Sequence, residues 1–184
     1  MLKNIQEDIK SGQFRQVYLL YGEEAYLKQQ YKYNLVKALN PDEDTMNFSR
    51  FEGKGLNVKE LIDLFETMPF FADRRVVLLE DTGFFKNKCD ELVDYMKALP
   101  EYLYLIFCES EVDKRSRMYK AVKACGSIGE FAKQDEKTLV RWAAGILGKN
   151  GRKITQRDVE LLLTMTGTDM GNLRMELEKL ICYT

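Results

Sequence analysis

Short apolar runs recur along the first 131 residues, at intervals that leave room for a helix between them. We expect strands at residues 17–21, 46–51, 75–80, 103–108 and 127–131. Two of these runs, Val76-Val-Leu-Leu79 and Tyr104-Leu-Ile-Phe107, are unbroken, which is typical of strands buried on both faces. Strands separated by helix-length segments predict right-handed crossovers and a mostly parallel sheet with flanking helices.

One predicted helix leads into an unusual segment. The apolar residues of 58–68 fall close to the spacing of an amphipathic helix, and Asn57 with Glu60 is arranged as a capping box. Pro69 ends this pattern because proline lacks a backbone donor and disfavours helical geometry in the preceding residue. We therefore expect residues 70–74 to form a loop that leads into the third strand.

The pattern changes after residue 131, where no further strand run follows. Three helices are predicted instead, at residues 135–149, 156–166 and 170–183. Asn150-Gly151 favours a left-handed backbone conformation that ends the first of these helices. We predict an α/β domain over residues 1–134 and a small three-helix domain over residues 135–184.

Composition removes several classes of chemistry. The 184 residues contain no histidine, which excludes Ser-His-Asp and Cys-His nucleophile pairs and imidazole zinc ligands. The 28 basic and 29 acidic residues give a net charge of −1 and no bulk electrostatic reason to expect nucleic acid or an acidic membrane as partner. The chain lacks both a signal peptide and an apolar run of ~18 residues, so we expect a cytosolic protein without membrane contact.

The cysteines stand singly along the chain, at Cys89, Cys108, Cys125 and Cys182. Without a C-x-x-C pair, neither a zinc ribbon nor a thioredoxin-type motif is available. We expect all four to be reduced thiols in the core, and we expect no bound metal.

A parallel sheet followed by a helical domain calls for a search for a nucleotide site in the turn after the first strand, residues 21–28. A P-loop requires G-x-x-x-x-G-K-[ST] to wrap phosphates and hold Mg²⁺, and the required residues are missing. Glu23 and Glu24 stand where phosphate needs positive potential. The acidic end of segment 76–81 resembles an NTPase magnesium site only faintly, and a solvated strand end is the preferred interpretation. We expect no cofactor.

Basic residues gather in two places. The first cluster is Lys114, Arg115 and Arg117. The second lies in the helical domain and comprises Lys137, Arg141, Lys149, Arg152, Lys153 and Arg157. Aromatic residues do not interleave them, as they do in many nucleic-acid grooves, so we favour solvated helix faces and keep a weak DNA contact as the alternative. The single Trp142 lies in an apolar helical stripe and is expected in the core.

The pair Phe70-Phe71 follows a proline in an expected loop. Adjacent residues cannot both face the core from one regular helix or strand, so at least one ring is expected in solvent. Spacing alone leaves open that the rings fold back over the sheet edge. A similar pair, Phe84-Phe85, could support the loop, contact a partner or fill the core.

Several stretches form an ordered set that spans the chain. They are Val17-Tyr-Leu-Leu-Tyr-Gly-Glu-Glu24 with Tyr26-Leu27, Thr67-Met-Pro-Phe-Phe-Ala-Asp-Arg-Arg-Val-Val77, Asp113-Lys-Arg115, Leu139 with Trp142, and Glu176-Leu-Glu-Lys-Leu180 with Tyr183. This set resembles the delta subunit of the bacterial DNA polymerase III clamp loader. The resemblance implies an AAA+-like domain with a five-stranded parallel sheet and a helical lid, both without ATP binding, in agreement with the missing P-loop.

The resemblance also implies a function in DNA replication. The family's first domain binds the β sliding clamp by inserting apolar side chains from the segment between the third helix and third strand, and it favours the opened clamp without catalysis. The residues carried over to this role are Met68, Pro69, Phe70, Phe71 and Arg74. Other members carry Leu-Phe where this chain has Phe-Phe. The alternatives are an ATP-binding NTPase subunit of the loader and a DNA-binding module.

The family has a third, helical collar domain that joins the other loader subunits, and no stretch here corresponds to it. The chain ends at Thr184 while a helical pattern is still running, without a glycine cap or polar tail. We expect the natural protein to continue, a frayed native terminus being the alternative. We also expect these 184 residues to be monomeric and not to assemble a loader.

Overall fold

The computed structural model describes residues 2–183, which fall into two compact units. The sheet unit comprises the residues up to Glu23 together with Lys28–Phe131. The helical unit comprises Glu24–Leu27 together with the chain from Ala132 onward. Thr184, where the sequence predicts an interrupted helix, lies outside the described residues.

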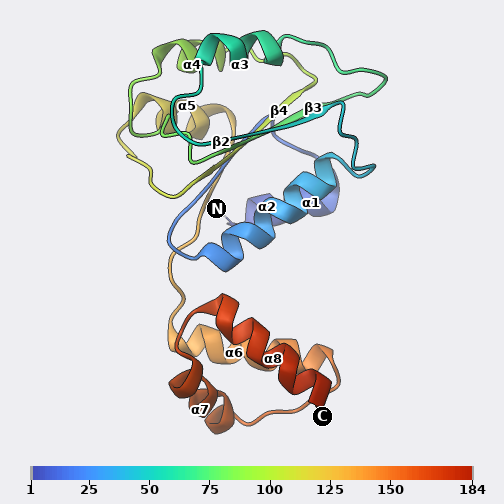
Figure 1. The fold of residues 1–184 in the computed structure, drawn as a ribbon, viewed down its shortest axis with the longest axis vertical. Helices are drawn as coiled ribbons and strands as arrows, with labels where there is room; N and C mark the ends of the chain where they lie inside the picture. The colour runs from blue at the N-terminus through green and yellow to red at the C-terminus, as the bar shows by residue number, and fades with distance from the viewer. Residues whose placement is uncertain (1, 184) are drawn as a thin grey trace. The chain divides into compact units, whose positions relative to one another are not determined.

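The sheet unit is built on five parallel strands in the order β2-β3-β4-β1-β5 (Figure 1). The strands are β1 (Val17–Tyr21), β2 (Phe48–Glu52), β3 (Arg75–Glu80), β4 (Leu103–Glu109) and β5 (Ser127–Glu130). In register, Val17 of β1 lies beside Leu105 of β4, and Val77 of β3 lies on the other side of Leu105. The central strands are buried on both faces, which explains their unbroken apolar runs and confirms the predicted sheet.

Helices cover both faces of this sheet (Figure 1). They are α1 (Leu2–Ser11) and α2 (Ala25–Leu39) on one face, and α3 (Val58–Phe65), α4 (Asp90–Tyr95) and α5 (Arg117–Cys125) on the other. The largest core cluster joins the second group to the sheet, with Phe65, Leu92 and Val122 fully buried beside Phe107. The first group contributes the fully buried Ile5 and Leu35.

Helix α3 is shorter than predicted. Asn57 caps it by accepting a hydrogen bond from the Lys59 N–H, as expected, but the helix ends at Phe65 rather than Met68. The Thr67 carbonyl accepts a hydrogen bond from the Arg75 side chain, so the chain leaves the helix before the proline is reached. The loop into β3 is therefore longer than the sequence indicates.

Strand β2 begins at Phe48, two residues later than predicted. The preceding residues are held in a turn, in which the Met46 N–H donates to the Asp44 carboxylate at 2.8 Å. The side chain of Asn47 bonds to Phe70, which lies outside the β2 segment. These contacts keep residues 44–47 out of the regular strand.

The helical unit consists of three packed helices and the short segment Glu24–Leu27. The helices are α6 (Glu136–Lys149), α7 (Gln156–Thr166) and α8 (Met170–Tyr183), close to the predicted bounds. Leu139, Val159 and Leu173 are fully buried between them. Trp142 lies at the rim of this core, half-buried, with its ring edge-on to Tyr26 at 5.6 Å, rather than in its interior.

The cysteines are unpaired but do not all lie in the core. Cys108 is buried and Cys89 half-buried, whereas Cys125 and Cys182 are exposed. The prediction of core thiols is wrong for these last two because they lie on outward faces of α5 and α8. Burial raises the pKa of the Cys108 thiol to about 11.

No helix within residues 2–183 combines the length and the apolar character that crossing a bilayer would require.

Candidate functional site

The segment between α3 and β3, residues 66–74, is here termed the apolar loop. Met68 is 74% exposed, Phe70 56% and Phe71 94%. The two rings contact each other edge to face, with centroids 4.4 Å apart. The possibility that both rings fold back over the sheet edge is thereby answered: they lie in solvent. Large apolar side chains gathered on one exposed segment are typical of interaction sites.

The backbone of Phe71 is strained. Its φ of 49° lies in the left-handed region, which bulky side chains rarely adopt. Such a conformation costs about 1–3 kcal/mol and persists only where the surrounding structure imposes it. The apolar loop must therefore be held by contacts outside itself.

Asn47 supplies one of these contacts. Its side chain is buried in the sheet unit and reaches the main chain of Phe70. Asn47 Oδ1 accepts a hydrogen bond from the Phe70 N–H at 2.6 Å, and Asn47 Nδ2 donates to the Phe70 carbonyl oxygen at 2.8 Å. Both backbone polar groups of Phe70 are satisfied while its ring stays exposed.

Arg75 supplies a second contact, at the start of the loop. The side chain is buried, with Nε donating to the Thr67 carbonyl at 2.7 Å and Nη2 to the Met68 carbonyl at 3.3 Å. These carbonyls follow the carboxyl end of α3, where a cation is favourable. The Tyr102 hydroxyl donates to the Glu66 carbonyl at 3.0 Å. The backbone of the loop is thus bonded at four of its residues, Glu66, Thr67, Met68 and Phe70.

The other two residues expected in the site are less exposed. Pro69 is half-buried, and the Arg74 guanidinium stacks over the rings of Phe14 and Tyr104, at 5.2 and 5.5 Å from their centroids. Of the five residues, Met68, Phe70 and Phe71 therefore form an exposed apolar surface, while Arg74 packs on the sheet unit.

Phe84 and Phe85 have a different environment. They are 7% and 0% exposed, and the Phe85 ring lies edge-on to Phe107 at 5.3 Å. Of the three roles left open by the sequence, core filling is the one that the structure shows.

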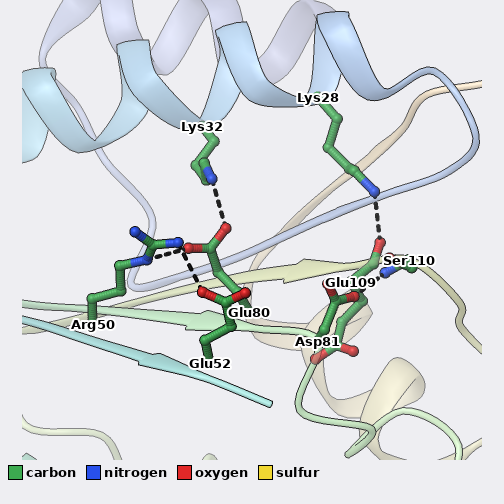
Figure 2. A network of polar contacts seen from close by, with 8 residues as sticks. All are labelled: Lys28, Lys32, Arg50, Glu52, Glu80, Asp81, Glu109 and Ser110. Carbon is green, nitrogen blue, oxygen red and sulfur yellow. Dashed lines mark hydrogen bonds and ion pairs between the residues drawn. The ribbon is translucent and has the colours of Figure 1, made fainter.

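The carboxyl ends of β1, β3 and β4 are the other candidate site, because parallel α/β sheets usually bind ligands there. Gly22 and Lys28 keep the spacing of the first glycine and the lysine in G-x-x-x-x-G-K-[ST], with Leu27 and Gln29 at the remaining positions. Lys28 is buried, and its ammonium donates to the carbonyl oxygen of Gly22 at 3.2 Å. It also donates to the carbonyl oxygen of Glu109 at 3.2 Å (Figure 2). The lysine is bound within the protein itself.

Glu80, at the end of β3, lies in an ion-pair network (Figure 2). It accepts from Lys32 Nζ at 2.6 Å and from Arg50 Nε at 2.5 Å, and its side chain is 8% exposed. Arg50 also pairs with Glu52 at 3.0 Å. The prediction of a solvated strand end is therefore wrong for Glu80, because two cations approach it from α2 and β2. It is correct for Asp81, which is exposed.

Glu109, at the end of β4, is buried against the neighbouring β3 turn. Its carboxylate accepts from the Thr82 hydroxyl at 2.5 Å and from the N–H groups of Thr82 and Gly83. Burial raises the pKa of Glu109, and these hydrogen bonds oppose that shift. The carboxylates of Glu80, Glu109 and Asp81 thus all bond to protein groups, that of Asp81 to the Ser110 N–H. Within residues 2–183, no cluster of three or more metal-ligating side chains occurs.

Comparison with known proteins decides which family the chain represents. The family model described as "DNA polymerase III, delta subunit" matches residues 18–131, more than half of the chain. The chain belongs to this delta subunit family. The resemblance inferred from the sequence is confirmed.

A curated sequence and a solved structure from Bacillus subtilis, both described as delta, are among the matches. The DNA polymerase III subunit delta of strain 168 is 23% identical over the whole chain. The solved structure of the Bacillus subtilis DNA clamp loader delta protein (YqeN) covers the whole chain with a TM-score of 0.76 and 20% identity. The chain spans 56% and 57% of the lengths of these delta relatives.

A gamma-subunit-related DNA polymerase III protein from Thermotoga maritima shares the fold more distantly. It matches 97% of the chain, and the chain covers 57% of it, with a TM-score of 0.55 and 14% identity. At these identities the structural matches support the fold, a parallel five-stranded sheet with flanking helices, and the family model supports the subunit type.

The basic cluster that follows β4 in this delta-family chain is paired with acids. Lys114 bonds to Glu130 at 2.8 Å, Arg115 to Asp113 at 3.2 Å, and Arg117 to Asp90 at 2.6 Å. All are largely exposed, as expected for a solvated face, so each pair adds little stability. Their charge is locally balanced, which weakens the case for a DNA contact at this place.

Sequence reasoning missed Asn47, Arg75 and Lys28. Asn47 and Phe70 are separated by 23 residues, and no pattern links them. Lys28 could have been noticed from its P-loop spacing, but its burial and carbonyl partners could not.

Proposed function

We propose that this chain binds the β sliding clamp through the apolar loop and favours the clamp's opened form, as the clamp-binding part of a DNA polymerase III delta subunit. The observation that carries the proposal is the exposed pair Phe70-Phe71, projecting from a backbone that the sheet unit holds in a strained conformation. Family membership supplies the partner, since the delta relative of known structure is described as a clamp loader protein.

The physical properties of the loop suit this role. Buried aromatic anchors commonly dominate interface energy, and two large rings supply apolar area at a small cost in side-chain entropy. A loop whose backbone is already tied loses little further freedom on docking. If the loop contacts the opened clamp more favourably than the closed one, binding shifts the clamp population by that difference in affinity.

We infer that the role is non-catalytic and independent of nucleotide bound to this chain. Support comes from the carboxyl end of the sheet, where Lys28 and Glu80 bond to protein groups and the P-loop glycine and hydroxyl positions hold Leu27 and Gln29. ATP would then act through partner subunits. We propose that the helical unit corresponds to the lid domain, and that contacts with other loader subunits need parts of the delta protein beyond this chain.

Calorimetric titration against the cognate β clamp tests the proposal. Wild type is expected to bind, and the double change Phe70→Ala and Phe71→Ala is expected to weaken binding by ~2 kcal/mol or more, roughly thirtyfold. The matched control is Leu161→Ala with Met165→Ala, which removes two exposed apolar side chains of the helical unit, 59% and 77% exposed. The control should bind as wild type does. Equal weakening by both double variants, or no binding by folded wild type, would contradict the proposal.

A direct nucleotide titration separates the NTPase alternative. We expect no micromolar, magnesium-dependent ATP affinity from this chain. Such an affinity would show that Lys28 and Glu80 exchange their protein partners for phosphate and metal, and it would overturn the nucleotide-independent role.

A further inference from the structure

The conformation of the apolar loop depends on a residue outside the loop. We propose that Asn47 is the positioning residue for the Phe70-Phe71 pair: by fixing the peptide groups of Phe70, it holds both rings outward in the conformation that docks on the clamp. The inference rests on the proposed function and extends the binding element to the segment before β2.

The first step is the geometry of the contact. The Asn47 carboxamide has one acceptor oxygen and an NH2 group with two donor hydrogens. The oxygen and one of the donors bond the same residue, at 2.6 Å to the Phe70 N–H and 2.8 Å to the Phe70 carbonyl oxygen. Asn47 is 4% exposed, so water does not readily replace it. The contact resembles the paired bonds that adjacent strands exchange, but one partner is a side chain.

The second step is that Asn47 is itself fixed. The backbone carbonyl oxygen of Asn47 accepts a hydrogen bond from the Val76 N–H at 2.9 Å, which joins Asn47 to β3. Its Nδ2 also donates to the Asp44 carboxylate at 2.5 Å. Asp44 is held in turn by Asn40, whose side chain bonds both the N–H and the carbonyl of Asp44 at 3.0 Å. The carboxamide is therefore oriented by the sheet and the turn before it reaches the loop.

The third step is the strain that Asn47 maintains. Phe71 follows directly after the fixed peptide groups of Phe70 and has φ 49°, a conformation that an untethered loop with a large side chain would leave. Phe71 also lines a hollow of about 460 Å³ together with Asn40, Asp44 and Asn47, so the core does not pack the ring in place. Backbone anchoring through Phe70, and not packing of the Phe71 ring, accounts for the outward direction.

The first test needs no clamp. In the Asn47→Ala variant the exchange rate of the Phe70 amide with solvent deuterium, measured by NMR, should rise about tenfold or more, because its acceptor is removed. Amides within β3 should keep their wild-type rates. The control is Asn57→Ala, which removes the cap at the other end of α3 without touching the loop. An unchanged Phe70 rate in Asn47→Ala, or an equal rise in the control, overturns the proposal.

The second test is a double-mutant cycle with the β clamp. Asn47→Ala is expected to weaken clamp binding about tenfold in the wild-type background, and about threefold or less when Phe71→Ala is already present, since its effect passes through the rings. A general loss of stability would weaken binding by the same factor in both backgrounds, and that result counts against the proposal. Asn47→Asp, which keeps the acceptor for the Phe70 N–H but turns a carboxylate oxygen toward the Phe70 carbonyl and the Asp44 carboxylate, should weaken binding at least as much as Asn47→Ala.

The two tests separate this inference from the proposed function. If Phe70→Ala with Phe71→Ala leaves clamp binding unchanged, the clamp-binding role of the loop fails whatever Asn47 does. If the rings matter but Asn47→Ala neither releases the Phe70 amide nor weakens binding, only the positioning role fails.

Discussion

Strand β3 begins at Arg75, beside the apolar loop, and ends at Glu80, in the ion-pair network. The side chains at its two ends differ in exposure and in polarity. At the amino end, aromatic rings lie in solvent while a buried cation ties the backbone. At the carboxyl end, the buried carboxylate of Glu80 is paired with Lys32 and Arg50. The end at which α/β sheets usually bind ligands is thus closed by the protein's own groups, and the opposite end carries the accessible apolar surface.

The two phenylalanine pairs give the sharpest contrast. Phe85→Ala should lower the free energy of unfolding by about 3–5 kcal/mol, because it removes a fully buried ring and leaves a cavity. Phe71→Ala should change it by no more than about 0.5 kcal/mol, because the ring is 94% exposed. Urea unfolding of both variants checks this. A loss at Phe71 comparable with that at Phe85 would mean that the loop ring belongs to the core.

The ion-pair network should be the next most sensitive place. Glu80→Ala leaves the largely buried Lys32 side chain, 14% exposed, without its partner and should cost about 3 kcal/mol of unfolding free energy. Glu52→Ala is the matched control, because this exposed carboxylate also bonds Arg50 but should cost less than about 1 kcal/mol. Denaturant unfolding at neutral pH measures both. Similar small losses would show that the carboxyl end of β3 does not depend on internal charge pairing.

The smallest expected effect concerns the strain at Phe71. Phe71→Gly should be more stable than Phe71→Ala by about 1 kcal/mol, because glycine adopts positive φ without a Cβ clash. At Phe70, which is not among the positive-φ residues of the described chain, the order should reverse, with alanine more stable than glycine. Thermal unfolding of the four variants decides the sign at each position. The same order of stability at both positions would contradict the claim that the backbone at Phe71 is strained.

Much of the fold could be predicted from the sequence because most helices and strands depend on patterns of neighbouring residues. Buried strands such as β3 and β4 show unbroken apolar runs, α7 begins and ends where its spacing and turn residues indicate, and α8 begins where they indicate. The end of α3 could not be predicted, because it depends on Arg75 bonding back to Thr67, a contact that forms only when β3 is in place.

The candidate site shows the same division. Proline followed by two phenylalanines indicates an exposed apolar loop, and the family resemblance indicates its role. The residues that hold the loop are not marked in the sequence, since Asn47 and Phe70 meet only through the pairing of β2 with β3. The burial of Glu80 was likewise hidden, because Lys32 and Arg50 come from separate elements.

The most direct measurement is the hydrogen–deuterium exchange footprint of the chain with and without the β clamp. The account predicts slower exchange in residues 66–74 when the clamp is added, and unchanged exchange at residues 22–28 and 109–113, with or without magnesium ATP. Slower exchange at the carboxyl ends of β1 and β4, with residues 66–74 unaffected, would contradict the claim that the apolar loop is the clamp-binding surface.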